Sequence, residues 1–509
     1  MTRRDLLRIG ALAIPAGATS CLRPRPEARL LASAAPLPPR FEVPLPRPPV
    51  AQPVRSDAGT DYYDFAVRPA PARILPGLTT EIWGYDGVFP GPTIEARRGR
   101  RVSLRLRNQL PVPIVTHLHG GRTAPESDGY PTDLILPAAG FAPLHLHDPL
   151  ARVAMAEREY VYANDQPAAT LWYHDHRMDF TAPQVWRGLA GFYLLRDPEE
   201  DRLPLPRGGR EIPLMICDRS FASDGSLQYP ARDPELRQAP AFLPQYMGGV
   251  LGDVILVNGA PWPRLDVANV KYRFRILNAS NARRYELALD PAPRTAAPFI
   301  QIGSDGGLLP APVAHQTIRI APAERFDVII DFSKFAAGSS VKLVNLAASG
   351  PASQILRFDI TENQRDDTAI PARLSAEPAI AGKPSQVRDF DFTFVRFHPR
   401  GMMNGWTING LPFDPARMDA RPRLDSTEIW RIQSDFSHPL HLHLVHFRVL
   451  AHDGRPGPYD SGWKDTIDLG PGQGATILAR FSGYRGRYVF HCHNLEHEDM
   501  SMMANFEVI

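Results

Sequence analysis

The chain has 509 residues, of which 43% are hydrophobic, and a formal net charge of +2. This length suits three domains with a sizeable core, and so small a net charge gives no reason to expect a nucleic acid as partner. The 53 prolines and 38 glycines stand among short alternating apolar runs. Such a pattern favours an all-β chain of many strands and turns over a helical one.

Residues 1–21 have the features of an export signal. The sequence TRRDLL at residues 2–7 has a twin-arginine look, and the apolar stretch of residues 9–18 is too short to span a bilayer. The alternative is a basic, disordered start. ATSC at residues 18–21 resembles a lipoprotein cleavage box, in which Cys21 would be lipidated and would be the only attachment to a membrane; cleavage elsewhere is the alternative. We therefore expect a bacterial protein exported by the twin-arginine route to the periplasm or cell surface.

Residues 22–55 are rich in Pro, Ala and Arg. This composition predicts a linker, a tether without a core of its own. The chain has three cysteines, so only Cys217 remains beside Cys21 and Cys492. A disulfide framework is therefore not expected, and Cys217, in the apolar run PLMICD, is most simply a buried core residue.

One alternating strand recurs three times along the chain. It appears as RVSLRLRN at Arg101, KYRFRILN at Lys271 and TEIWRIQS at Thr427, each ending in Asn or Ser. A histidine motif follows the first and third copies but not the second. The recurrence predicts a threefold duplication of one β-sandwich unit, with units at residues 56–197, 198–387 (including a trailing linker) and 388–509.

Four of the five His-X-His pairs in the chain belong to longer motifs in the first and third of these units. Successive side chains of a strand point to opposite faces, so each pair can present two imidazoles on one face. Three pairs belong to the motifs HLHG, WYHDH and HPLHLH, and the fourth flanks a cysteine in HCHNLEHEDMSMM. The pairs offer eight nitrogen ligands: His117, His119, His174, His176, His441, His443, His491 and His493.

Cys492 faces the opposite side of its strand from the two histidines that flank it. With His438, His497 and Met502 it makes a set of two imidazoles, one thiolate and one weak thioether, which is typical of a blue-copper electron-transfer site. A second metal site held by His491 and His493 would then be joined to the blue copper by a short covalent path through Cys492 and the backbone. The alternative, a free buried cysteine beside surface histidines, does not account for four pairs.

The four histidine motifs, in this order and spacing, resemble the copper motifs of the multicopper oxidases. Stretches such as ILVNGAPWPRLDV and IAPAERFDVIIDF resemble the bacterial laccases of the spore-coat type and the bilirubin oxidases, and the resemblance runs from about Tyr62 to Ile509. It implies a cupredoxin-like Greek-key β-sandwich for each unit and four copper ions, one blue and three in a trinuclear cluster. One departure is Ser501, where many relatives have Gly before the axial Met.

The resemblance also implies roles for single residues. His117 and His441 would hold the single copper of the cluster, and the coupled pair would take the other six histidines of the four pairs. Glu498 and Asp128 match the acidic residues with which relatives deliver protons; the alternative for each is a solvated surface carboxylate. Trp406, in NGWTINGL, matches a segment near the blue copper of bilirubin oxidases, or is simply a core residue. The remaining pair, His145 and His147, belongs to no motif and is expected in a surface loop.

The function implied is a laccase-like oxidase. A small phenol, aromatic amine or bilirubin-type reductant would give single electrons, and dioxygen would be reduced to water. One alternative is a cuprous oxidase serving copper tolerance, but such relatives usually carry a methionine-rich insert in the third unit, and residues 349–400 contain no methionine. The other is a scaffold without activity, against which the presence of all twelve ligands argues.

Overall fold

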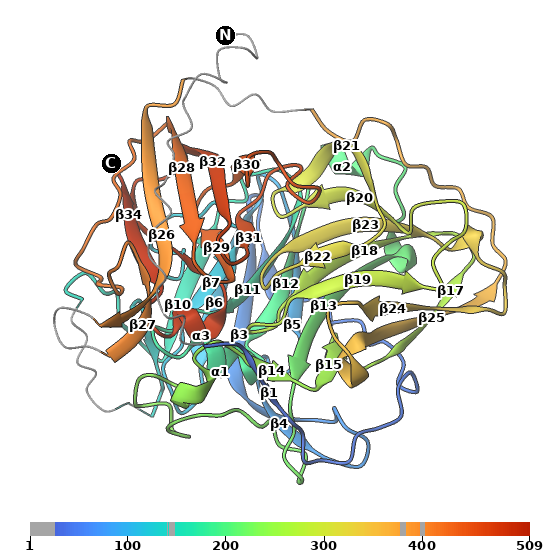
Figure 1. Ribbon diagram of the computed structural model, residues 1–509, viewed down its shortest axis with the longest axis horizontal. Helices are drawn as coiled ribbons and strands as arrows, with labels where there is room; N and C mark the ends of the chain where they lie inside the picture. Colours follow the sequence, from blue (N-terminus) through green and yellow to red (C-terminus); the bar gives the residue numbers. More distant parts are fainter. Residues whose placement is uncertain (1–25, 140, 142–147, 377–382, 398–402) are drawn as a thin grey trace, which may run out of the picture.

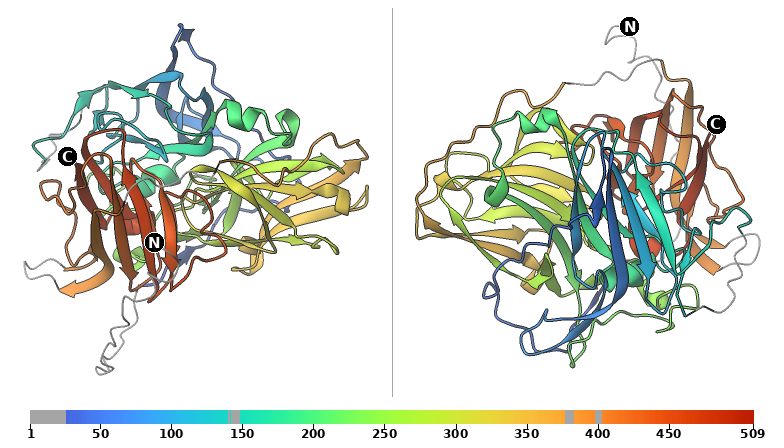
Figure 2. Two further views of the ribbon diagram at one scale, coloured as in Figure 1. Left: turned by 90° about the horizontal axis from the view of Figure 1, so that it is seen from above. Right: turned by 180° about the vertical axis from the view of Figure 1, so that it is seen from behind.

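The computed structural model describes residues 26–139, 141, 148–376, 383–397 and 403–509. The export signal and the pair His145 and His147 lie outside these residues. The chain forms three cupredoxin-like β-sandwiches, which confirms the all-β fold expected from the alternating runs (Figure 1). Figure 2 shows the blue-to-cyan first, yellow-green second and orange-to-red third sandwich side by side. No helix in the described ranges is long and apolar enough to cross a membrane.

The first sandwich packs two sheets over a core that includes Leu104, Leu171 and Tyr193. One sheet has the order β10-β6-β3-β2, with β4 on β3, and the other has the order β5-β12-β11-β7. The bounds are β2 Arg55–Ser56, β3 Thr60–Ala72, β4 Thr80–Tyr85, β5 Gly91–Arg97, β6 Arg101–Asn108, β7 Thr116–His119, β10 Glu157–Tyr162, β11 Ala169–Asp175 and β12 Ala190–Arg196. A short ribbon, β8 Ile135–Leu136 with β9 Ala154–Met155, lies beside them.

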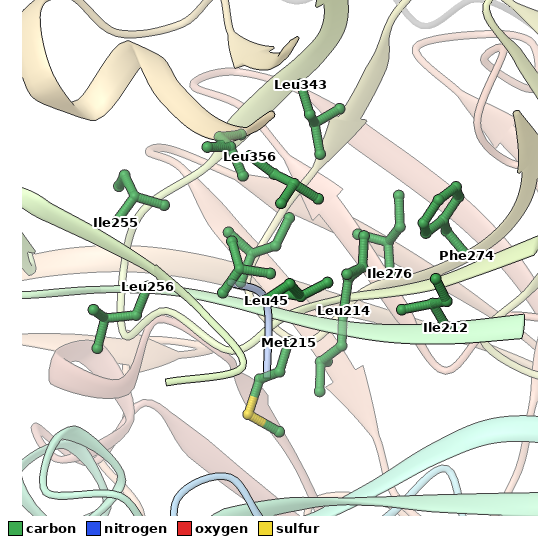
Figure 3. Close-up of a cluster of buried hydrophobic side chains, with 14 of the residues drawn as sticks. Leu45, Ile212, Leu214, Met215, Ile255, Leu256, Phe274, Ile276, Leu343 and Leu356 are labelled. Atoms are coloured by element: carbon green, nitrogen blue, oxygen red, sulfur yellow. The ribbon is translucent and has the colours of Figure 1, made fainter. Parts of the chain in front are cut away.

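The second sandwich has the sheet orders β16-β15-β13-β18-β23-β20-β21 and β17-β25-β24-β19-β22. Its core, drawn in Figure 3, joins Phe274 and Ile276 of one sheet to Leu343 and Leu356 of the other. The bounds are β13 Glu211–Arg219, β15 Val254–Val257, β16 Ala260–Pro261, β17 Arg264–Ala268, β18 Lys271–Asn278, β19 Tyr285–Asp290, β20 Phe299–Ser304, β21 Gly307–His315, β22 Ile318–Ile320, β23 Arg325–Asp331, β24 Ser340–Asn345 and β25 Gln354–Glu362. Cys217 on β13 is fully buried, as predicted, and burial raises the pKa of its thiol to about 11.

The third sandwich has the sheet orders β27-β26-β28-β32-β30 and β31-β29-β33-β34. Strand β32 alternates buried and half-buried residues along its whole length, the pattern of a sheet with one face on a core. The bounds are β26 Gln386–Phe397, β27 Met403–Ile408, β28 Ser426–Ser434, β29 His438–Leu442, β30 Phe447–His452, β31 Thr466–Leu469, β32 Gly474–Phe481, β33 Gly486–Cys492 and β34 Met503–Val508. The short helices are α1 Thr181–Trp186, α2 Pro198–Asp201 and α3 Leu495–Glu498.

The recurring strand takes the same place in each sandwich. RVSLRLRN is β6, KYRFRILN is β18 and TEIWRIQS is β28. Each of them pairs in parallel with a strand that precedes it in the chain (β3, β13 and β26) and antiparallel with one that follows (β10, β23 and β32). The sequence repeat is therefore a repeat of topology.

The expectation of a tether without a core is wrong for residues 26–55. β1, Arg29–Leu31, pairs in parallel with β14, Val250–Gly252, and further on the Leu45 amide donates to the carbonyl of Arg264 at 2.7 Å. Ala35 and Leu45 join the core of the second sandwich (Figure 3 labels Leu45). Composition alone missed this because two well-placed apolar side chains suffice to anchor a proline-rich segment whose backbone needs few partners of its own.

Candidate metal centres

The four His-X-His pairs meet where the first sandwich faces the third. Strands β7 and β29, which carry histidines of two of these pairs, are labelled next to each other in Figure 1. HLHG begins on β7 and WYHDH on β11 of the first sandwich, while HPLHLH begins on β29 and the last motif at the end of β33 of the third. Three second histidines, His176, His443 and His493, each lie one residue past the end of their strand. The two pairs of strands have matching registers: His117 stands opposite His174, and His441 stands opposite His491. Duplication of one sandwich thus accounts for two equivalent halves of a single site.

The imidazoles converge in three groups, and every one of them is buried. The Nε2 atoms of His117 and His441 lie 3.4 Å apart. The His491 Nε2 atom lies 3.2 Å from that of His176 and 3.3 Å from that of His443. The third group consists of His119, His174 and His493, whose ligand atoms lie within 4.8 Å of one another.

Three of the four pairs are split between two groups, because the two histidines of each motif on β11, β29 and β33 lie in different groups. His117 and His119 lie together with His441, and His119 also belongs to the group of His174 and His493. Residues two apart on a strand share a face but are separated by about 6.5–7 Å along it, so one pair spans two neighbouring positions rather than chelating one ion. Four such pairs build a compact centre with three metal positions.

Hydrogen bonds on the outer ring nitrogens select the atoms that point inward. The Nδ1–H groups of His117, His441 and His174 donate to the carbonyls of Asp128, Asp465 and Asp175 at 2.5, 2.9 and 2.8 Å. Because neutral imidazole has one donor and one acceptor nitrogen, the Nε2 lone pairs of these rings face the centre. Such outer contacts orient metal-binding histidines in general.

Several inward atoms have no protein partner, which is the signature expected of metal ligands. Within the described residues, His119 Nδ1, His174 Nε2 and both nitrogens of His493 are buried without a hydrogen bond. Burial, followed by neighbouring imidazoles, lowers the pKa of His176 well below its ordinary value, so its ring is neutral. Neutral imidazole is the form that binds copper or zinc, and the residues therefore fit the metal that the sequence predicts.

The second site contains Cys492, His438 and His497. The sulfur of Cys492 lies 3.4 Å from His438 Nδ1 and 3.6 Å from His497 Nδ1, and these two nitrogens are 3.0 Å apart. All three side chains are buried. One thiolate with two imidazoles is the trigonal set of blue-copper proteins.

Met502 lies in the same core cluster as Cys492, and its carbonyl accepts from the Cys492 amide at 3.1 Å. The turn before it is built by Ser501, whose φ of 68° lies in the left-handed region that favours glycine. A glycine would therefore adopt this turn with less strain than Ser501.

Cys492 stands between the two sites. Its sulfur faces His438 and His497, while the side chains of His491 and His493 belong to the histidine groups on the other side of the backbone. The alternation of side chains along β33 places His491 and Cys492 on opposite sides, and His493 follows in a bend just past the end of the strand.

Both candidate acidic residues are buried, so the alternative of a solvated surface carboxylate is wrong. Glu498 has an oxygen 3.3 Å from His176 Nδ1 and another 3.2 Å from His491 Nδ1, and it accepts from the Thr181 hydroxyl at 2.7 Å. Asp128 lies 2.8 Å from His443 Nδ1, and burial raises its pKa to about 6. The two carboxyls therefore flank the histidine centre.

Trp406 is both a core residue and a neighbour of the cysteine site. It is fully buried, its ring stacks on His497 with centroids 4.0 Å apart, and its indole N–H donates to the Met247 carbonyl at 2.7 Å. Sequence reasoning missed Asp465, whose carboxylate lies 3.0 Å from His119 Nε2. It sits far from any histidine motif in the chain, and no local pattern identifies it.

Comparison with known proteins shows the family of the chain. Two family models described as multicopper oxidase match the chain, one at residues 66–143 and 150–200 and the other at residues 384–509. The laccase of Bacillus stratosphericus is 40% identical over 92% of this chain and 99% of its own length. The bilirubin oxidase of Albifimbria verrucaria is 35% identical over 94% of this chain and 82% of its own length. The crystal structure of a laccase from Pediococcus acidilactici superimposes with a TM-score of 0.80 at 32% identity, covering 94% of this chain and 96% of that one. The chain belongs to the multicopper oxidases.

Proposed function

We propose that this oxidase uses the two sites for different halves of one reaction. His438, Cys492, His497 and Met502 hold the blue copper. His117 and His441 hold the single copper of the trinuclear cluster, and the coupled pair is held by His119, His174, His176, His443, His491 and His493. The observation that carries the proposal is the position of Cys492 between its own trigonal set and the three histidine groups.

Bound copper supplies one-electron transfer at the first site and four-electron reduction of dioxygen to water at the second. The protein contributes the path between them, since Cys492 is bonded directly to His491 and His493 through the backbone. It also contributes proton carriers. Glu498 can hold a proton between His176 and His491, and Asp128, with its raised pKa of about 6, can hold one beside His443.

The organic reductant is a phenol, an aromatic amine or a bilirubin-type pigment. Support comes from laccases that are 40% and 37% identical and a bilirubin oxidase that is 35% identical, all covering more than nine tenths of the chain. A cuprous oxidase is the competing function, and the absence of methionine from residues 349–400 argues against it.

The test is oxygen uptake by the copper-loaded enzyme with a methoxyphenol, bilirubin or Cu(I) as reductant under one set of conditions. Faster uptake with an organic reductant than with Cu(I) supports the laccase-like function. The opposite ranking would make the protein a cuprous oxidase. The Cys492→Ser variant serves as the control, because it keeps every histidine of the trinuclear site and should show no uptake with any reductant.

We propose further that residues 1–21 direct export through the twin-arginine route and that the enzyme works in the periplasm or at the cell surface. The motif at residues 2–7 supports this. Replacing Arg3 and Arg4 with Lys and fractionating the cells tests it: the variant should stay in the cytoplasm. Mass analysis of the mature N-terminus distinguishes lipidated Cys21 from another cleavage site.

A further inference from the structure

Arg325 reaches the histidine centre from the middle sandwich. Within the described residues no metal group takes a histidine from that sandwich, yet Arg325, at the start of β23, is fully buried beside the centre. Its guanidinium bonds both oxygens of Asp465, with Nη1–Oδ1 at 2.7 Å and Nη2–Oδ2 at 2.5 Å. A bidentate arginine–carboxylate pair fixes orientation as well as charge.

Every N–H of this guanidinium has an acceptor. Besides the Asp465 carboxylate, Nε donates to the Thr170 carbonyl at 3.0 Å, Nη1 to the Ala323 carbonyl at 3.0 Å and Nη2 to the Asp305 carbonyl at 3.1 Å. Five donors therefore meet five acceptors, drawn from strands or turns of all three sandwiches. These five hydrogen bonds fix the Arg325 side chain in one orientation, and its bidentate pair with Asp465 fixes the carboxylate as well.

Asp465 in turn holds two histidines that come from different sandwiches. Its Oδ1 atom accepts from His119 Nε2 at 3.0 Å, and its backbone carbonyl accepts from His441 Nδ1 at 2.9 Å. The two rings are stacked with centroids 3.6 Å apart. Consequently His119 leaves its Nδ1 atom without a protein partner in the described structure, while His441 directs its Nε2 atom toward His117. One aspartate thus sets opposite ring orientations at two neighbouring positions.

We propose that Arg325 is a positioning residue of the trinuclear site, which it acts on from the copper-free sandwich by holding Asp465 against His119 and His441. This inference rests on the proposed function of the histidine groups. It gives the middle sandwich a part in the chemistry beyond spacing the other two. Within the described residues Arg325 makes no hydrogen bond to a histidine of the metal groups, so it positions these histidines through Asp465.

The glycine of HLHG supports this assignment. A Cβ atom on Gly120 would lie 2.7 Å from Arg325 Nη2 and 2.8 Å from Asp465 Oδ2, both closer than real contacts allow. Gly120 also has a φ of +83°, where side chains are disfavoured. The ion pair therefore occupies the space beside the motif that carries His117 and His119, and the motif leaves room for it.

The competing explanation is that Arg325 only stabilises the fold, as other buried arginines do. Arg273 is a matched control. It lies on the neighbouring strand β18, is equally buried, and makes a bidentate pair with Asp327 at 2.8 and 2.5 Å. No histidine is among its recorded partners in the described structure. Loss of either arginine removes a buried ion pair, but only Arg325 is connected to the metal groups.

The experiment compares Arg325→Met, Arg325→Lys and Arg273→Met with the wild type as full-length, copper-loaded proteins. Copper per chain, copper affinity by chelator competition, and the electron paramagnetic resonance signals of the blue copper and of the single copper of the cluster are measured. We expect both Arg325 variants to change the signal of the single copper and to weaken copper binding at the cluster by about 10- to 100-fold. The blue signal should stay, and Arg273→Met should lower the thermal midpoint without changing either signal.

Wild-type copper affinity and an unchanged single-copper signal in Arg325→Lys would overturn the proposal. That variant keeps the charge and one donor group, so it remains informative if Arg325→Met does not fold. An equal change of signal in Arg273→Met would also overturn it, because the effect would then be one of general stability. A wild-type protein that holds a blue copper but no cluster copper would instead overturn the proposed function of the histidine groups, and with it this role.

Discussion

Glu200 offers a quantitative test of how the first and second sandwiches are joined. It lies in α2, directly after the last strand of the first sandwich, and is only 2% exposed. One of its oxygens accepts from Arg273 Nη2 and from Arg275 Nη2, both at 2.5 Å. Arg275 also donates to the Thr170 hydroxyl on β11 at 3.0 Å. Replacement by Gln keeps the shape of this junction and removes its central charge.

The expected loss follows from the electrostatics of the carboxyl. Burial raises the pKa of Glu200, but Arg275 and Arg273 outweigh burial and lower it from 4.5 to about 2. This difference corresponds to about 3 kcal/mol of stability, in line with the 3–5 kcal/mol lost on average when one partner of a buried ion pair is removed. For a unit of this size we expect the midpoint of thermal unfolding to fall by about 5–10 °C.

The pH dependence has a definite sign. Because the folded pKa is below the unfolded one, the stabilisation is present above about pH 4.5 and is lost as the pH falls toward 2. Differential scanning calorimetry of wild type and Glu200→Gln should therefore show a deficit at pH 7 that shrinks at pH 3. Copper release in acid affects both proteins and cancels in the difference. Glu199→Gln, an exposed neighbour on the same helix, is the control. Equal midpoints at pH 7, or a deficit that does not depend on pH, would refute the reasoning.

Two further substitutions test other parts of the structure. Leu45→Ala should lower the free energy of unfolding, measured by denaturant titration, by about 2–3 kcal/mol, because it leaves a cavity in the core of the second sandwich. Leu30→Ala is the control: this side chain is 57% exposed, and its loss should change the free energy of unfolding by less than about 0.5 kcal/mol. Trp406→Ala removes the ring stacked on His497 and the hydrogen-bond donor to Met247, so we expect the blue absorption band to shift. Trp406→Phe keeps an aromatic ring and should keep the band. An unchanged band in Trp406→Ala would show that the stacked ring does not hold His497 in place.

The sequence was sufficient for the fold and for the identity of the histidine clusters. Alternating runs ending in Asn or Ser predicted the three equivalent strands, because a half-buried strand reveals itself by its period of two. The same period placed the histidines of each pair on one face and Cys492 on the other. These properties are local in the chain, and local patterns survive in a sequence read alone.

What the sequence did not reveal depends on contacts between distant segments. Asp465 and Arg325 lie 140 positions apart and meet only in the folded chain. The burial of Glu498 and Asp128 depends in the same way on how the sandwiches pack. Residues 26–55 were mistaken for a free tether because composition does not show which apolar residues find a core.

The most direct test of the central claim is the ratio of reductant oxidised to oxygen consumed, measured in an oxygen electrode with a one-electron organic donor. An enzyme in which Cys492 connects a blue copper to a trinuclear site should oxidise four donors for each dioxygen, without hydrogen peroxide in solution. A ratio of two with equimolar peroxide would contradict the account, because it would mean that the histidine groups do not act together in reducing dioxygen to water.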